Sequence, residues 1–212
     1  MRCLLTLICI VIVASAALGA SQGRMQSADD VAVYEAVLAS TIRAEVDRFS
    51  AGARIKTPAP ILTFDRTLMV CRPTADHSRR MGCVRREDVL AVEDGSEKFG
   101  RPVFGRRLTS TGRRELVEAF RLRNREERPF AGTTIQGLMV VPPDQLDAAI
   151  QREAGRTRGY VGFSQPVFAD DGHAVVYASY ICGGLCGSGW FFILQRQAAS
   201  WKVLDVAMMW IS

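Results

Sequence analysis

The last fifty residues constrain the fold of this chain most strongly. Four runs of strand length, rich in apolar, aromatic and β-branched residues, follow one another there: GYVGFSQPVF, HAVVYASYIC, GWFFILQRQ and SWKVLDVAMMWI. Short turn segments separate them, namely Ala169-Asp170-Asp171-Gly172, the CGGLCGS loop and Ala198-Ala199. Consecutive strands joined by tight turns favour an antiparallel meander. We therefore predict a curved antiparallel β-meander at the C-terminus.

Helical patterns precede this meander. A capping box at Ser27–Asp30 is followed by apolar residues at three- and four-residue steps as far as Phe49. Further helices are predicted after Ser110-Thr111 and after Pro142-Pro143-Asp144. Between the first two helices, ILTFDRTLMVC and GCVRREDVLAV have the texture of strands. The prediction is an α+β fold, with an N-terminal amphipathic helix and further helices packed on the meander.

The N-terminus predicts export. A single positive charge, Arg2, precedes an uncharged apolar run that ends in small residues, and this is the layout of a secretory signal peptide. We assign residues 1–20 to the signal peptide and residues 21–212 to a single α+β domain, located in the periplasm or outside the cell. The alternative is a retained membrane anchor, since the run is about long enough to span a bilayer. After cleavage, no stable membrane span is expected.

Four cysteines remain after cleavage, and two of them lie in the stretch ICGGLCGSGW. An even number of cysteines in an exported chain indicates disulfides, and local pairing of Cys71 with Cys83 and of Cys182 with Cys186 fits best among three connectivities. The spacings do not match paired zinc knuckles. A redox pair usually has the form C-x-x-C at the start of a helix, and a phosphate loop needs a lysine and a following helix. The stretch is therefore interpreted as a disulfide-closed hairpin end.

The distribution of charged residues along the chain indicates no nucleic-acid partner. Removal of Arg2 lowers the net charge from +5 to +4, and the region between Arg79 and Arg128 has thirteen arginines and one lysine against nine acids. Such a basic patch could meet nucleic acid or anionic lipid. The signs alternate, however, and few aromatic residues are interleaved for base stacking. We interpret the region as a solvated basic face.

The sequence offers few candidates for catalysis. A nucleophile–base group could be drawn from Ser164 or Ser188 with His173 and Asp170, but no G-x-S-x-G elbow is present. The other histidine, His77, lies between the first two mature cysteines. Two further sets of acids stand out: Asp144 and Asp147, interpreted as helix-start residues, and Asp205. The last shares a strand face with Val203 and Ala207 if the strand is regular, and burial there would raise its pKa. We assign no catalytic, cofactor-binding or metal-binding residue.

The C-terminal third resembles a group of small exported bacterial proteins. The shared pattern is an A-x-V-Y strand, a C-G-G-x-C-G-x-G loop and W-K-V before a terminal W-I-S. Here its elements are Ala174–Tyr177, Cys182–Gly189, Trp201–Val203 and Trp210–Ser212. The resemblance covers roughly the last hundred residues and is specific in the final fifty, and residues 55–107 have no counterpart. It implies an exported α+β protein and implies no particular activity.

Two functions from different classes remain. The first is a non-enzymatic binding or envelope-associated module with an unknown protein or small-molecule partner. The alternative is a cone-shaped fold resembling nuclear transport factor, in which a helix and curved sheet enclose a pocket that binds or hydrolyses a small molecule. Candidate pocket residues are then Tyr177, Tyr180, Trp190 and Asp205. A third hypothesis is a hydrolase inhibitor that presents the 182–189 loop, which predicts that this loop protrudes.

Overall fold

The computed structural model describes residues 27–45, 61–71, 83–104, 107–130, 134–152, 159–183 and 186–212. The helical elements are α2 (Ala28–Val37), the π-helical turn η2 (Leu38–Ile42), α4 (Arg86–Asp94), α5 (Ser110–Arg123), the 3₁₀ turn η4 (Pro143–Gln145) and α6 (Leu146–Arg152). The strands are β1 (Ile61–Phe64), β2 (Met69–Val70), β3 (Cys83–Val84), β4 (Glu97–Lys98), β5 (Arg101–Pro102), β6 (Leu138–Val141), β7 (Tyr160–Phe163), β8 (Val167–Phe168), β9 (His173–Gly183), β10 (Cys186–Gln197) and β11 (Ser200–Ile211).

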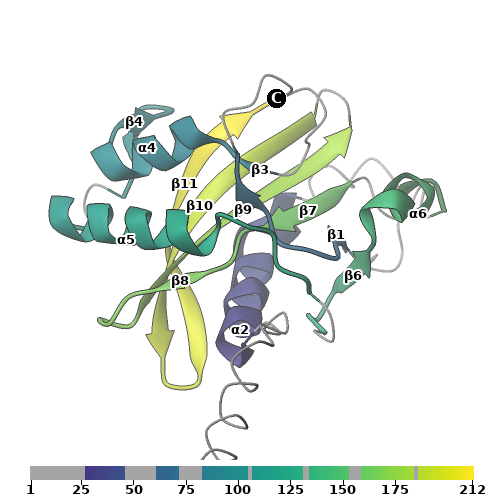
Figure 1. The fold of residues 1–212 in the computed structure, drawn as a ribbon, viewed down its shortest axis with the longest axis horizontal. Helices are drawn as coiled ribbons and strands as arrows, with labels where there is room; N and C mark the ends of the chain where they lie inside the picture. Colours follow the sequence, from purple (N-terminus) through teal and green to yellow (C-terminus); the bar gives the residue numbers. More distant parts are fainter. Residues whose placement is uncertain are drawn as a thin grey trace, which may run out of the picture.

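A seven-stranded mixed sheet forms the centre of the fold (Figure 1). Its order is β11-β10-β9-β7-β1-β6, and β8 also pairs with β9. The strands from β7 to β11 are antiparallel, as the meander prediction requires, whereas β1 is parallel to both β6 and β7. The predicted α+β class is confirmed, and the two parallel pairings are what the sequence did not indicate.

Helices cover both faces of this sheet (Figure 1). On one face, α2 and η2 bury an apolar cluster that includes Tyr34, Trp190 and Phe192. On the other face, α4 and α5 bury a second cluster, with Phe120 and Phe191 in edge-to-face contact at 5.2 Å between ring centroids. A third, smaller cluster lies under α6. The space between α2 and the sheet is therefore occupied by the buried side chains of the first cluster.

The first helix begins as the sequence predicts. Ser27 accepts a hydrogen bond from the N–H of Asp30, and the Asp30 carboxylate accepts one from the N–H of Ser27. The same carboxylate is buried and accepts from Arg123 of α5 at 2.8 Å. The hydroxyl of Tyr34 donates to the carbonyl of Ser164 at 3.2 Å, which fixes the helix to the sheet. The part of this predicted helix that extends to Phe49 lies outside the described residues.

One predicted strand is a helix. Only the first two residues of CVRREDVLAV form a strand, β3, and the segment from Arg86 onward is α4. Glu87 and Asp88 occupy its first turn, where acids favour a helix start, and Gly95 ends it at φ 66°. Its short apolar run resembles strand alternation, although Val89 and Val92 lie one helical turn apart and are both buried.

Two other predicted strands are interrupted. The run that starts at Ile61 breaks into β1 and β2, because an irregular segment around Arg66 lies between them. The run that starts at Gly159 breaks into β7 and β8 around Gln165, and both pieces pair with the same strand, β9. The helices predicted after Ser110 and Pro143 are present as α5 and as η4 with α6. Strand β6 was not predicted.

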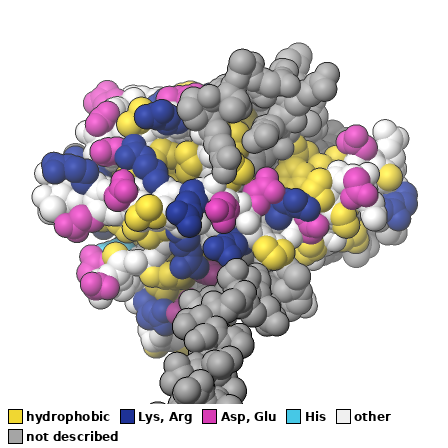
Figure 2. All heavy atoms as spheres, viewed as in Figure 1, with side chains coloured by type: hydrophobic (Ala, Val, Ile, Leu, Met, Phe, Trp, Pro, Cys, Tyr) yellow, Lys and Arg dark blue, Asp and Glu magenta, His cyan; other side chains and the backbone are white. Residues whose placement is uncertain are grey.

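Charged side chains of both signs are interspersed over α4 and α5 (Figure 2). Several arginines on this side are paired, as in the contact of Arg121 with Glu93 at 2.6 Å and that of Arg85 with Asp88 at 3.0 Å. Within the described ranges, no helix has the length and apolar character needed to cross a membrane.

Candidate functional site

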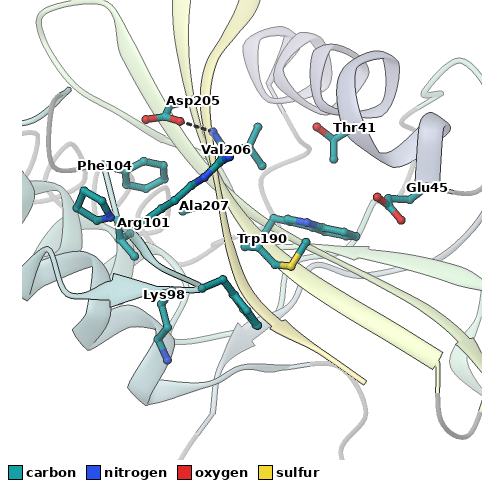
Figure 3. A pocket seen from close by; sticks show the side chains of 13 residues that line it. Thr41, Glu45, Lys98, Arg101, Phe104, Trp190, Asp205, Val206 and Ala207 are labelled. Carbon is teal, nitrogen blue, oxygen red and sulfur yellow. Dashed lines mark hydrogen bonds between the residues drawn. The ribbon is translucent and has the colours of Figure 1, made fainter.

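A cavity of about 820 Å³ lies at the β11 edge of the sheet (Figure 3). It is open to solvent and is built from three segments that are far apart in the sequence. Its lining residues are Thr41 and Glu45 from the N-terminal helix, residues 98, 99 and 101–104 from the β4–β5 hairpin and its exit, and Trp190 with Asp205–Met208 from the sheet. We refer to this space as the edge cavity.

The β11 part of the edge cavity lies between two β-bulges. Asp205 pairs with Ile193 but Val203 with Leu194, so that Leu204 is an extra residue. In the same way Trp190 pairs with Met208 and Gly189 with Trp210, so that Met209 is extra. Bulges re-aim side chains and end regular pairing at sheet edges. The four residues Asp205–Met208 are thereby a short regular stretch on the edge strand.

The β4–β5 hairpin forms the opposite wall. Its two-residue turn consists of Phe99 at φ 50° and Gly100 at φ 73°, a pair of left-handed residues that suits a tight hairpin. Phe104, just after the hairpin, also has a positive φ of 55°. A bulky residue in this region is strained by about 1–2 kcal/mol. Two of the three described non-glycine residues with positive φ thus line the edge cavity, and Phe99 is 60% exposed.

Four charged side chains line the edge cavity. Lys98 lies 3.9 Å from the buried Asp88, and Asp205 accepts a hydrogen bond from the N–H of Val206 at 2.9 Å (Figure 3). Glu45 also has an interaction partner. Arg101 differs, because its guanidinium makes no ion pair or side-chain hydrogen bond with any residue that the structure describes. The cavity therefore combines apolar walls with one cation at its rim that has no partner among the described residues.

The four predicted pocket residues separate into two sets. Trp190 and Asp205 line the edge cavity. Tyr177 and Tyr180 are buried in the clusters on opposite faces of the sheet, away from this cavity. The sequence predicted that Asp205 shares a strand face with both Val203 and Ala207, and this is wrong because the bulge at Leu204 breaks the alternation. Val203 packs with the α2 cluster, whereas Ala207 packs with the α4–α5 cluster on the opposite face.

Sequence reasoning missed the hairpin residues Phe99, Arg101 and Phe104. Their only signal is the Phe99-Gly100 pair between two very short strands, and nothing in the sequence places them beside β11. Lys98 of this hairpin lies 3.9 Å from the buried carboxylate of Asp88. Burial raises the pKa of Asp88, and the hydrogen bond from the guanidinium of Arg85 partly opposes that rise.

Two glycines of ICGGLCGSGW, Gly187 and Gly189, serve close packing. The Nε1–H of Trp210 donates to the hydroxyl of Tyr177 at 2.7 Å, and both groups lie where a side chain on Gly189 would be. Burial raises the pKa of the Tyr177 hydroxyl, which keeps it protonated at neutral pH. The N–H and carbonyl of Gly187 exchange hydrogen bonds with Ser212 at 3.4 and 2.9 Å. We call this contact of Tyr177, Gly189 and Trp210 the indole junction.

Both predicted disulfides are present. Cys71–Cys83 joins the parallel pair β2–β3, and Cys182–Cys186 closes the β9–β10 hairpin, each with Cα atoms 5.1 Å apart. The chain-entropy model assigns about 3 kcal/mol to the longer loop and about 2 kcal/mol to the shorter one. Ser188 and Gly189 are buried within β10, so the described part of the 182–189 loop belongs to the sheet and does not protrude.

The residues considered for catalysis do not assemble into a nucleophile–base group. The hydroxyl of Ser164 is buried and accepts from the N–H of Tyr177 at 2.9 Å, so it serves the break between β7 and β8. His173 contacts Asp171 at 2.9 Å, and this contact lowers the pKa of Asp171. Asp144 and Asp147 start η4 and α6. His77 lies outside the described residues.

The described residues contain no cluster of three or more His, Cys, Asp or Glu side chains that could hold a metal ion. In comparisons with known proteins, no family model matches the chain, and no curated protein and no solved structure shows significant similarity to it. The edge cavity itself is therefore the basis for assigning a function.

Proposed function

We propose that this chain is an exported, disulfide-stapled binding protein and that the edge cavity is its ligand site. The observation that carries the proposal is the construction of this cavity. Helix, hairpin and edge strand leave about 820 Å³ between them, within the range of protein pockets that bind small ligands. Phe99 and Phe104 hold strained backbone conformations at its wall, and such strain concentrates at ligand sites.

The character of the walls supports binding as the role. Phe104, Trp190 and Met208 give apolar contact area, while Arg101 supplies a charge that no described residue pairs. A few polar groups among apolar walls orient a ligand and give specificity. The described residues that line this cavity include no serine, cysteine or histidine, which are common nucleophiles and bases in hydrolases, so binding without catalysis is the function that we propose.

Export to the periplasm or the medium is the second part of the proposal. It is supported by the layout of residues 1–20 and by two disulfides, which form and persist in oxidising compartments. N-terminal sequencing of the protein from its native host should give a chain that starts between Ala17 and Ser21. An intact N-terminus in the membrane fraction would contradict cleavage and would indicate an anchor.

Filling the edge cavity should weaken binding. We expect the mature chain to bind one molecule of anilinonaphthalene sulfonate, an apolar dye with one anionic group, and fluorescence titration measures its affinity. Thr41→Trp places an indole in the cavity from the helix side, because Thr41 lines it (Figure 3). The expected result is a loss of affinity of about tenfold or more, equivalent to about 1.4 kcal/mol.

The matched control is Ala44→Trp. Ala44 is exposed on the same helix but does not line the edge cavity. Dye affinity should stay within about twofold of the parent for this variant, since exposed substitutions away from a site change little. Equal losses in both variants, or no dye binding by the parent chain, would contradict the proposed site.

A further inference from the structure

The backbone of β11 offers hydrogen-bonding groups to the edge cavity. In the sheet, β11 is the terminal strand, and among the described residues it pairs with β10 alone. An edge strand presents a row of N–H and C=O groups that can pair with another extended chain. The two bulges limit this row to Asp205–Met208, because regular pairing ends at Leu204 and Met209. The stretch is long enough for a partner strand of about four residues.

The walls stand on both sides of this edge. Trp190 and Met208 belong to the face that α2 covers, whereas Phe104 and Ala207 belong to the face that α4 and α5 cover. All four line the edge cavity, so the cavity straddles the strand. An extended chain that pairs with β11 would direct alternate side chains to the two walls, since successive side chains in a strand point to opposite faces.

The two walls differ in charge. The hairpin wall carries Arg101, whose guanidinium has no ionic partner among the described residues, and Lys98 beside it. The one described acid that lines the cavity on this side, Asp205, already accepts a hydrogen bond from the N–H of Val206. The helix wall is made of Trp190 and Met208, with Thr41 and an already partnered Glu45 at its rim. An acidic side chain suits the first wall and an apolar side chain suits the second.

We propose that the ligand of the edge cavity is an extended peptide of alternating apolar and acidic residues, which adds as a short strand to β11 along Asp205–Met208. This inference rests on the proposed function and specifies its ligand. Main-chain hydrogen bonds give such strand addition its affinity, and pockets for alternate side chains give it specificity. The Asp205 carboxylate holds the N–H of Val206 in the free protein, and such a charge on an edge strand prevents unspecific pairing.

The test uses the mature chain and three defined peptides. The first is acetyl-Val-Glu-Val-Glu-Val-amide, the second has lysine in place of glutamate, and the third is the first peptide with N-methyl groups on alternate backbone nitrogens. Calorimetric titration should show binding of the first, about fivefold weaker binding of the second, and about tenfold weaker binding of the third. The fivefold loss for the lysine peptide corresponds to one exposed ion pair. The tenfold loss for the N-methylated peptide corresponds to about two lost hydrogen bonds.

Reversal of the charge at Arg101 tests whether this residue selects the acidic side chains of the peptide. Arg101→Glu should exchange the preference, so that the lysine peptide binds more tightly than the glutamate peptide. Arg114→Glu is the matched control, since Arg114 is an exposed arginine on α5 that does not line the edge cavity, and it should leave both affinities unchanged. Hydrogen exchange should slow on binding at those amides of Asp205–Met208 that do not already pair with β10. Equal binding of the N-methylated peptide, or a preference unaffected by Arg101→Glu, would overturn the inference.

The inference and the proposed function can fail separately. If the dye binds and Thr41→Trp weakens its binding, but no peptide binds or displaces it, the peptide ligand is refuted while the cavity remains a binding site. If neither dye nor peptide binds, both proposals fall. A concentration-dependent dimer that excludes the peptide would show that a second copy of the chain occupies the edge, and it would refute the peptide ligand as well.

Discussion

Replacement of Gly189 by alanine is expected to lower the free energy of unfolding by about 3–5 kcal/mol. At the indole junction, the added methyl group would overlap both the Trp210 Nε1 and the Tyr177 hydroxyl. Overpacking of a core costs about 1–3 kcal/mol. Separation of the two polar groups would also leave the buried hydroxyl of Tyr177 without its hydrogen-bond donor, at about 1–3 kcal/mol for an unsatisfied buried group.

Equilibrium denaturation under non-reducing conditions measures this loss. For a chain of this length, the change corresponds to a fall of about 10 °C in the melting temperature. Gly172→Ala is the control: Gly172 lies in a turn, at φ 82°, and apart from its chain neighbours no residue has an atom within 4 Å of the place that an added methyl group would take. That variant should cost only the backbone strain of about 1–2 kcal/mol.

The cause of the Gly189→Ala effect can be isolated with Trp210→Phe. The smaller ring removes the indole nitrogen that the methyl group would overlap. In the Gly189→Ala background this second change should therefore recover part of the lost stability, whereas in the parent it should be destabilising. A Gly189→Ala protein as stable as the parent would contradict the packing of the indole junction.

The indole junction also shows why a local sequence pattern predicted the C-terminal fold so well. Tyr177, Gly189 and Trp210 belong to three consecutive strands, and short turns bring consecutive strands together. The cysteine spacing likewise determined the pairings, since each disulfide closes a short loop. What failed was the interpretation of short apolar runs. In VLAV, a four-residue run, strand and helix periodicity are not distinguishable without the acidic start and glycine end that bound α4.

The edge cavity could not be predicted from the sequence for a different reason. Its walls come from the N-terminal helix, the β4–β5 hairpin and the last strand, and no pattern states that these three segments meet. The face occupied by Asp205 was also inaccessible to prediction, because a bulge at Leu204 breaks the alternation that the sequence implies. Trp190 was a candidate only as part of the cone-shaped-fold hypothesis, which looked for pocket residues on the sheet, and the exposed Phe99 of the hairpin was not a candidate.

The second large effect is expected for Arg123→Met, at about 3–5 kcal/mol of lost stability. Arg123 donates to both oxygens of the Asp30 carboxylate, at 2.8 and 3.1 Å, and thereby joins α5 to the start of α2. The two side chains differ in burial, since Asp30 is 4% exposed and Arg123 is 38% exposed. Loss of the cation leaves a buried charge without its partner, which is the costly way to break an ion pair. Methionine retains an apolar stem beside Phe168, over which the guanidinium lies at 5.6 Å.

The difference in burial between Asp30 and Arg123 also predicts how the related variants rank in stability. Asp30→Asn should cost less than Arg123→Met, because the arginine that remains is partly exposed and can be solvated by water. The double variant should be more stable than Arg123→Met alone, since the amide removes the buried charge. Arg121→Met is the matched control on the same helix: its partner Glu93 is 24% exposed, and a pair so accessible to water contributes about 1 kcal/mol or less. Urea denaturation of the four variants gives these differences directly. If Arg123→Met and Arg121→Met lose equal stability, then the buried carboxylate does not depend on its arginine, and the N-terminal helix is held in place by its apolar face and the Tyr34–Ser164 hydrogen bond without this ion pair.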